Sequence, residues 1–353
     1  MSTKLWIAGL NPFSPESNCA LQDINLSSVL PLEERSPKFI ISFGPLHAFI
    51  AQDNKLYTFC VLSEQRKSVG FEADILSLAA NSKFCLVLLA SGRLLKYDPS
   101  VDVSVPVVGF LGIEGNEPKT VKDESITHLA CGECVTLACT STNAIYNIPN
   151  HTATLPKHVK ISKVVAGFEH CLLLTTNGDV YSWGGGLRGQ LGNGEIVAIV
   201  DQPHLVEALA GVKIVDIAAE GWHSAAVSSF GDLYTWGWNN QGQLGLLDHE
   251  YDGRVVSQPQ IVSFPGNADA TVTRIHCGIG HTVAEVTTVD GTHEVLIAGW
   301  NLEKRFDYSR APSTPAFDGF RKLPQPAAPA DAIEVGAGPN LVYFLQRAAC
   351  AEK

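Results

Sequence analysis

The sequence lacks several features that would place it in a familiar functional class. Its 25 Lys and Arg residues are outnumbered by 36 Asp and Glu, giving a formal net charge of −11. A chain of this charge has no global attraction to nucleic acid or anionic lipid. No apolar run approaches the roughly 18 residues of a transmembrane helix, and the first residues lack the apolar segment of a secretory signal. We therefore expect no direct nucleic-acid contact and no membrane insertion.

Recognisable catalytic constellations are missing as well. We find no Ser-His-Asp pattern, no paired carboxylates at catalytic spacing and no nucleophile elbow. The nine cysteines form an odd number, and without a secretory signal they indicate reduced thiols in the nucleus or cytoplasm. The sequence thus predicts a protein that is not an enzyme and binds no cofactor.

One stretch of the sequence is present twice. Residues 160–194 and 213–246 align with a constant step of 53 residues. The step relates a histidine, a turn glycine, a Tyr-x-Trp-Gly segment and a Gly-Gln-Leu-Gly segment (His170 and His223, Gly178 and Gly231, Trp183 and Trp236, 189–192 and 242–245). A period of about 40–55 residues without helical spacing indicates a propeller or a similar β array.

Each copy has the pattern of one antiparallel blade. An apolar run leads to a corner of small residues, then to the histidine and a second apolar run. Asn177-Gly178 is a strong hairpin signal, because both residues tolerate a positive φ. The strand after it alternates, with Val180 and Ser182 on one face and Tyr181 and Trp183 on the other.

Seven copies of this unit are present, counted by their corner residues (Gly44, Asn81, Gly132, Gly167, Glu220, Gly278 and Gly338). The seventh lacks its outer strands, and residues 3–11 resemble the segment 296–301 of the sixth unit. We therefore predict an all-β, seven-bladed propeller closed by the N-terminal strand 3–11, because closure removes an unpaired sheet edge. Residues 1–353 would form this single domain, as a monomer.

The combination of Ala-Gly-x-x-His, Asn-Gly-Asp-Val-Tyr-Ser-Trp-Gly and Gly-Gln-Leu-Gly resembles the repeat of the regulator of chromosome condensation family. The motif is complete in two units and weaker elsewhere. The resemblance implies a seven-bladed propeller. The family includes a nuclear exchange factor for a small GTPase, chromatin-bound proteins, ubiquitin-ligase components and adaptors. The chain resembles the short, single-propeller members most, which implies a nuclear or chromatin-linked protein partner such as a JmjC-type histone-modifying oxygenase.

A guanine-nucleotide exchange factor for a Ran-like small GTPase is the alternative. Exchange factors of this type push a β-wedge towards the nucleotide and attach to chromatin by a basic tail. Residues 1–40 contain only Lys4, Arg35 and Lys38 as basic residues, so that tail is missing. The insertion 98–125 is the candidate wedge, although proline and glycine interrupt it. We therefore prefer a non-catalytic adaptor.

Two motifs resemble ligand sites and are better explained by the repeat. Residues 184–189 fit Gly-x-Gly-x-x-Gly, but no helix is expected after them to hold a pyrophosphate. His128, Cys131, Cys134 and Cys139 have plausible zinc spacing. Cys131 occupies a corner position that is Ala166 in another unit, so we interpret it as packing and expect no metal.

Recurring histidines and tryptophans also have structural interpretations. His47, His170, His223 and His281 share one repeat position, where we expect hydrogen bonds to the backbone of their own or the next blade rather than a metal or pH sensor. Trp183 and Trp236 are expected to pack between blades.

Four stretches interrupt the repeat: 12–37, 98–125, 246–271 and 302–332. Loops this long are usually functional or disordered. The last stretch combines arginine with aromatic side chains, which is typical of interface hot spots; a solvated loop is an equal alternative. The predicted partner-binding residues are Arg305, Phe306, Tyr308, Arg310, Phe320 and Arg321.

Overall fold

The computed structural model describes residues 4–9, 22–25, 39–60, 63, 65–107, 124–264, 269–299, 319–326 and 333–346. Within these ranges the chain forms β-strands, with only two short 3-10 helices, η1 (Glu207–Leu209) and η2 (His249–Tyr251). No helix in this part of the chain is long and apolar enough to cross a membrane.

The chain divides into two compact units, of which the first contains three four-stranded sheets. One is built from both ends of the chain: β1 (Lys4–Gly9), β2 (Gln22–Asn25), β27 (Ile333–Gly338) and β28 (Leu341–Gln346). The others are β3 (Phe39–Phe43), β4 (His47–Gln52), β5 (Lys55–Cys60) and β6 (Arg66–Gly70), and β7 (Ile75–Ala80), β8 (Cys85–Leu89), β9 (Leu94–Asp98) and β10 (Val103–Pro106).

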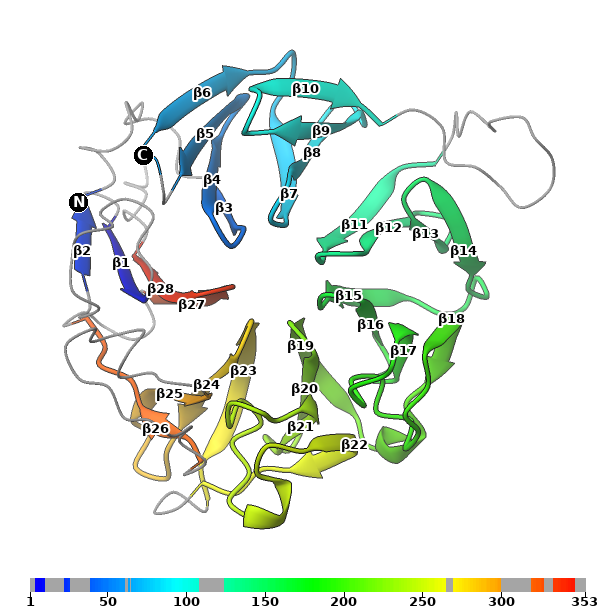
Figure 1. The fold of residues 1–353 in the computed structure, drawn as a ribbon, viewed down its shortest axis with the longest axis vertical. Coiled ribbons are helices and arrows are strands. Elements are labelled where there is room, and N and C mark those ends of the chain that lie inside the picture. Colours follow the sequence, from blue (N-terminus) through cyan, green and yellow to red (C-terminus); the bar gives the residue numbers. More distant parts are fainter. Residues whose placement is uncertain are drawn as a thin grey trace. The chain divides into compact units, whose positions relative to one another are not determined.

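The second unit contains four four-stranded sheets. They are formed by β11 (Ile126–Cys131), β12 (Thr136–Thr140), β13 (Ala144–Asn147) and β14 (Asn150–Thr154); β15 (Ile161–Ala166), β16 (His170–Thr175), β17 (Val180–Gly185) and β18 (Ile199–Leu205); β19 (Ile214–Glu220), β20 (His223–Ser228), β21 (Leu233–Trp238) and β22 (Val255–Ile261); and β23 (Thr271–Gly278), β24 (His281–Thr287), β25 (His293–Gly299) and β26 (Arg321–Lys322). Figure 1 shows β11, β15, β19 and β23 as the innermost strands of these sheets. The seven sheets are the blades of the predicted all-β, seven-bladed propeller.

The N-terminal strand completes the last blade, as predicted. β1 lies between β2 and β28 and pairs antiparallel with β28, from Lys4 opposite Gln346 to Gly9 opposite Leu341. Leu5 and Ile7 are fully buried in a hydrophobic cluster shared with β3, β4 and β5 of the next blade. The first strand of the sequence is therefore part of the core, because its hydrogen bonds and its apolar side chains are both used.

Hydrophobic clusters lie between neighbouring blades, which explains the repeat pattern. Leu172, Leu174 and Val180 of one blade pack against Ile217 and Trp236 of the next. The hairpin between β16 and β17 turns at Gly178 with a φ of 97°. A Cβ atom there would lie 2.9 Å from the backbone nitrogen of Ile214, so this turn needs both the positive φ and the missing side chain.

The stretches that interrupt the repeat also supply outermost strands. β2 lies in 12–37, β10 in 98–125, β22 in 246–271 and β26 in 302–332. An outermost strand pairs on one side only, and all four residues of β10 are exposed. Such a strand needs no alternation of apolar and polar residues, which is why the sequence pattern does not reveal it.

Candidate protein-interaction surface

The two repeated tryptophans belong to the core, as predicted. Trp183 is 5% exposed and Trp236 is fully buried. The indole nitrogen of Trp236 donates a hydrogen bond of 2.9 Å to the backbone oxygen of Gln190 in the preceding blade. Both side chains are thus used for packing and are not available to a ligand.

Two repeated histidines join neighbouring blades through a hydroxyl group. Nε2 of His170 lies 2.8 Å from Oγ of Ser224, which donates its proton to the backbone oxygen of Gln190 at 2.9 Å. Because that proton is already used, Nε2 of His170 must carry its own proton and donate it. An equivalent relay joins His223, Thr282 and Gln243. The predicted structural role is confirmed for both, with the difference that a hydroxyl stands between the ring and the backbone.

Burial keeps these two imidazoles neutral. Loss of solvent, and then the neighbouring His223, lowers the pKa of His170 to about 3. Burial likewise lowers the pKa of His223 to about 4. His281 is also buried, whereas His47 is only half-buried and packs near the ring of Phe49. The four histidines therefore do not share one environment.

The cysteines and glycines with ligand-like spacing lie in different surroundings. Cys139 is fully buried in the core and burial raises the pKa of its thiol to about 12, whereas Cys134 is exposed. Sγ of Cys131 donates to the backbone oxygen of its neighbour Gly132. Among the residues that the structure describes, no three His, Cys, Asp or Glu side chains are grouped as metal ligands. Residues 184–189 begin with the last two residues of β17 and continue into tight turns with no helix after them.

The predicted binding segment 302–332 is only partly described. Arg305, Phe306, Tyr308 and Arg310 lie outside the described residues. Phe320, a predicted partner-binding residue, is 8% exposed in the core, with its ring 5.3 Å from that of Phe264, which leaves little of its side chain accessible to a partner. It fills the space above Gly245, where a Cβ atom would come within 2.2 Å of its ring. Arg321, the next residue, is exposed on β26.

An aromatic cluster lies on the surface of the second unit. Phe168 and Trp222 meet edge to face with 4.7 Å between ring centroids, and Trp222 and Trp238 do so at 5.2 Å. The guanidinium carbon of Arg188 lies 4.2 Å from the ring centroid of Trp222 and 5.0 Å from that of Trp238. All four side chains are half-buried. We call Phe168, Arg188, Trp222 and Trp238 the aromatic cluster.

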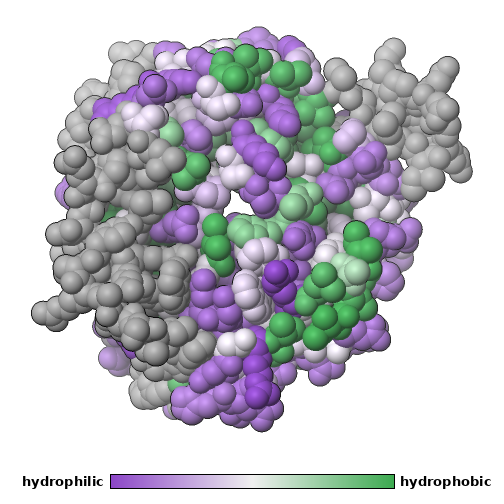
Figure 2. Space-filling model, viewed as in Figure 1, coloured by the Kyte–Doolittle hydropathy of each residue, from purple (hydrophilic) through white to green (hydrophobic). Residues whose placement is uncertain are grey.

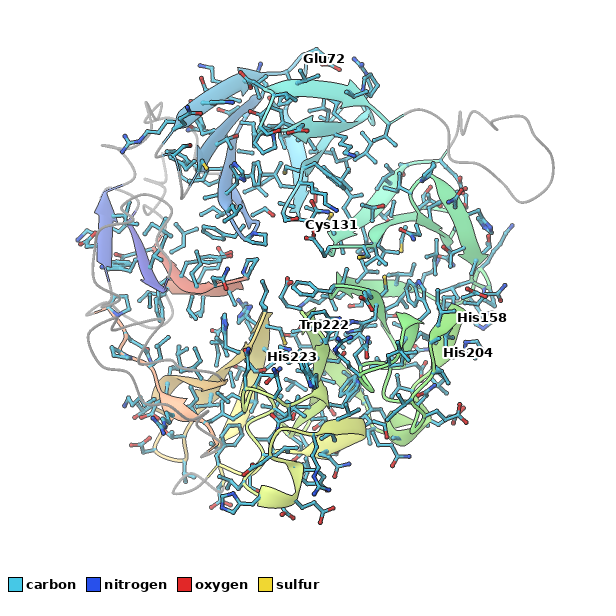
Figure 3. The ribbon with its side chains drawn as sticks, in the orientation of Figure 1. Glu72, Cys131, His158, His204, Trp222 and His223 are labelled. Atoms are coloured by element: carbon cyan, nitrogen blue, oxygen red, sulfur yellow. The ribbon has the colours of Figure 1, made fainter. Side chains whose placement is uncertain are left out.

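Hydrogen bonds between successive corners bring the cluster together. The backbone nitrogen of Cys134 donates to the oxygen of Phe168, and the nitrogen of Phe168 donates to the oxygen of Gly221, both at 2.7 Å. Within one blade, the nitrogen of Trp238 donates to the oxygen of Trp222 at 2.9 Å. Figure 3 shows Trp222 and His223 at the inner end of their blade, as Cys131 is in its own.

The cluster residues are departures from the repeat. With the 53-residue step, Trp222 takes the place of Glu169, Trp238 that of Gly185 and Glu220 that of Gly167. The blade of β15 to β18 folds without tryptophan at these positions, so the propeller does not require them. Sequence reasoning missed the cluster, although a comparison of the two strong copies for mismatches at surface corners would have indicated it.

Exposed hydrophobic residues are also found in the blade that contributes Arg188. In the segment that links β17 to β18 and at the start of β18, Leu187 is 55% exposed, Ile196 59% and Ile199 64%. Figure 2 shows hydrophobic residues gathered on the surface over β17 and β18. Tryptophan and arginine are the residues most enriched in protein-binding hot spots. The arrangement is suited to holding another protein.

The fold defines a repeat propeller, and family comparisons agree. Two models of the Regulator of chromosome condensation (RCC1) repeat match the chain, one at residues 177–227 and 231–284 and the other at 161–190 and 214–243. Residues 161–284 of the chain thus contain repeats of the regulator of chromosome condensation family, which confirms the resemblance seen in the sequence.

Relatives share the repeat region rather than their whole length. The chain is 40% identical to human RCC1 domain-containing protein 1 over 139 residues, which are 39% of this chain and 36% of that protein. It is 41% identical to human E3 ubiquitin-protein ligase HERC2 over 139 residues, 38% of this chain and 3% of that protein. The chain therefore spans about a third or less of these relatives.

A solved structure shows the same fold over the full chain. Prp20p from Saccharomyces cerevisiae superposes with a TM-score of 0.71 and 17% sequence identity, covering 99% of this chain and 93% of that one. The structure is described together with the binding properties of Prp20p to Gsp1p and histones. At this identity the likeness concerns the fold alone.

Proposed function

We propose that this chain is a non-catalytic protein-interaction propeller that acts as an adaptor or regulatory partner of a nuclear or chromatin-linked protein. The observation that carries the proposal is the aromatic cluster, because its tryptophans and arginine are exposed in part and are dispensable for the blade. Truncating a hot-spot side chain commonly reduces affinity by 2 kcal/mol or more, about thirtyfold. A location in the nucleus or cytoplasm fits such a partner.

The proposal is tested by capturing partners with the tagged protein in its own cells and identifying them by mass spectrometry. We expect Arg188→Ala to reduce the captured amount of a specific partner at least tenfold. Arg254→Ala is the matched control, since Arg254 is exposed on the same unit and loses the same charge. Equal capture by both variants would show that the aromatic cluster is not the binding surface.

The segment around Arg305, Phe306, Tyr308 and Arg310 stays a predicted second contact. The double variant Phe306→Ala with Arg310→Ala, run in the same capture, tests it by the same tenfold criterion. A JmjC-type oxygenase as the partner also stays a prediction, and mass spectrometry of the captured proteins decides it.

A nucleotide exchange factor for a Ran-like GTPase is the second candidate. Prp20p, which shares the fold, has a structure described with binding to Gsp1p. The proposed wedge 98–125 includes β10, the outer strand of a blade, and its remainder from 108 to 123 lies outside the described residues. Release of a fluorescent nucleotide from a Ran-like GTPase measures exchange directly. Acceleration that persists in Arg188→Ala but is lost on removing 108–118 would establish the exchange factor and overturn the adaptor.

A further inference from the structure

The first corner position of the β19–β20 hairpin is an ionisable residue, whereas no other unit has an ionisable residue at that position. Glu220 occupies the first corner position, which is glycine in five units and Asn81 in a sixth (Gly44, Gly132, Gly167, Gly278 and Gly338). A Cβ atom at Gly132 would lie 1.7 Å from the backbone oxygen of Gly167, so glycine suits this position sterically. Glu220 is thus a departure from the repeat, two residues from Trp222.

The environment of Glu220 is unfavourable for a charged carboxylate. The side chain is half-buried, and Oε1 accepts a hydrogen bond of 3.2 Å from the backbone nitrogen of Gly221. Burial first, and then the nearby Glu133, raise the pKa of Glu220 to about 7. The ion pairs found between described residues include neither Glu220 nor Glu169. The fold therefore places carboxylates together on this surface without supplying a cation to Glu220.

The adjoining aromatic rings already contact a cation of the chain itself. Trp222 and Trp238 already hold the guanidinium of Arg188 over their faces, an attraction that strengthens when water is excluded. The indole nitrogen of Trp222 is buried and has no hydrogen-bond acceptor among the described residues. Partly exposed rings that attract a cation, next to carboxylates, match a peptide with positive side chains.

We infer that the aromatic cluster and Glu220 form a docking surface for a basic segment of a partner protein, in which an Arg or Lys side chain lies against Trp222 and pairs with Glu220. The inference rests on the proposed function and specifies the charge of the partner. Charge complementarity carries it, because Glu133, Glu169 and Glu220 lie at linked corners beside the cluster. The net charge of −11 adds a long-range attraction for the same basic segment.

Fluorescence anisotropy with labelled peptides tests the inference. We would use (Gly-Arg)4 as the basic probe, with (Gly-Glu)4 and (Gly-Ser)4 as probes of equal length. Only (Gly-Arg)4 is expected to bind at pH 7, and Glu220→Gln should weaken it at least tenfold while keeping the shape of the side chain. Glu207→Gln, an exposed glutamate on η1 with the same charge change, should shift the affinity less than twofold. Equal weakening by both variants, preference for (Gly-Glu)4, or no binding of (Gly-Arg)4 would each overturn the inference.

Proton release gives a second, independent readout. A cation beside Glu220 favours its ionised form, so binding at pH 7 should expel part of a proton from a carboxyl that is half-protonated there. Calorimetry in two buffers of different ionisation enthalpy measures this release, which Glu220→Gln should abolish. Release that is unchanged in Glu220→Gln would contradict the pairing.

The partner captured in cells separates this inference from the proposed function. If Arg188→Ala loses the partner while Glu220→Gln retains it fully and excess (Gly-Arg)4 does not displace it, the interaction surface stands and the basic partner is wrong. If Arg188→Ala retains the partner as Arg254→Ala does, the proposed function at this surface is wrong, whatever the charge of the partner.

Discussion

At the scale of single residues, one blade contains tryptophans with different roles, one in the core and one at the surface. Trp236 is enclosed between blades, whereas Trp222 is half-buried beside Arg188. The two side chains differ because of where they lie in the blade. The Trp236 side chain is on a strand and faces the neighbouring sheet. Trp222 is at a corner, where the chain reverses direction close to solvent. Residue type alone does not separate these roles.

Replacing Trp236 by alanine is expected to reduce the free energy of unfolding by about 3–5 kcal/mol, because it leaves a large cavity. The backbone oxygen of Gln190 also loses the indole donor, although Ser224 still donates to it. Urea denaturation monitored by far-UV circular dichroism measures the change. Leu187→Ala, at an exposed position, is the control and should change stability by less than about 0.5 kcal/mol. Similar losses in both variants would remove Trp236 from the core.

The buried histidines predict a loss of stability in acid. An unfolded histidine binds a proton near pH 6.5, whereas His170 and His223 do so in the fold only near pH 3 and pH 4. The unfolded state therefore binds more protons between these values, and stability falls as the pH drops below about 6.5. At pH 5 each histidine is expected to remove about 2 kcal/mol.

Glu220 acts in the opposite direction over a neighbouring range. Its pKa of about 7 in the fold lies above the ordinary value of 4.5, so its carboxyl destabilises the fold progressively as the pH rises from about 4.5 to about 7. Urea denaturation of wild type and Glu220→Gln at pH 5 and pH 8 checks the sign. At pH 8 the Glu220→Gln variant should be more stable than wild type. When the pH is lowered from 8 to 5, its free energy of unfolding should fall by more than that of wild type. Parallel pH profiles would show that Glu220 is not perturbed.

At the scale of elements, a strand of two residues can still decide which side chains are core. β26 pairs Arg321 with Ile297 and Lys322 with Leu296. The residue before it, Phe320, enters the hydrophobic cluster with Phe264 and Leu244. Alternation along a strand places neighbours on opposite sides, so an aromatic residue and its adjacent arginine have separate roles.

We expect Phe320→Ala to destabilise the protein by about 3–5 kcal/mol and Arg321→Ala to change stability by less than about 0.5 kcal/mol. Thermal unfolding of the two single variants gives the comparison, with each serving as the control for the other. A Phe320→Ala variant that melts at the wild-type temperature would restore the interpretation of an exposed loop.

At the scale of the whole molecule, one blade depends on both ends of the chain. β1 lies between β2 and β28 and is buried from Leu5 to Gly9, with Leu5 and Ile7 in the core. Without it β28 would lose its outer partner, and an unpaired apolar edge promotes aggregation. The closure thus links the first residues of the sequence to the stability of that unit.

Deleting residues 1–11 should lower the melting temperature markedly and expose apolar surface. Differential scanning calorimetry and dye binding measure the two effects. A synthetic peptide of residues 1–25 added in trans should restore part of the loss, whereas a peptide with Leu5→Asp and Ile7→Asp should not. A truncated protein with the wild-type melting temperature would contradict the closure.

The sequence by itself determined the fold, because a blade is a local unit. Its turn at Gly178 and the alternation through Trp183 lie within a few residues of each other, and the 53-residue step repeats them. The closing strand was equally visible, since its apolar residues match those of another unit.

Only the tertiary structure decided the site. Arg188 and Trp222 belong to different blades and meet because the corners of those blades hydrogen-bond to each other. The burial of Phe320 likewise depends on Gly245 leaving room for its ring in three dimensions. The repeat pattern indicates which residues each blade needs for its own packing. It does not indicate which residues that depart from the pattern lie together at the surface.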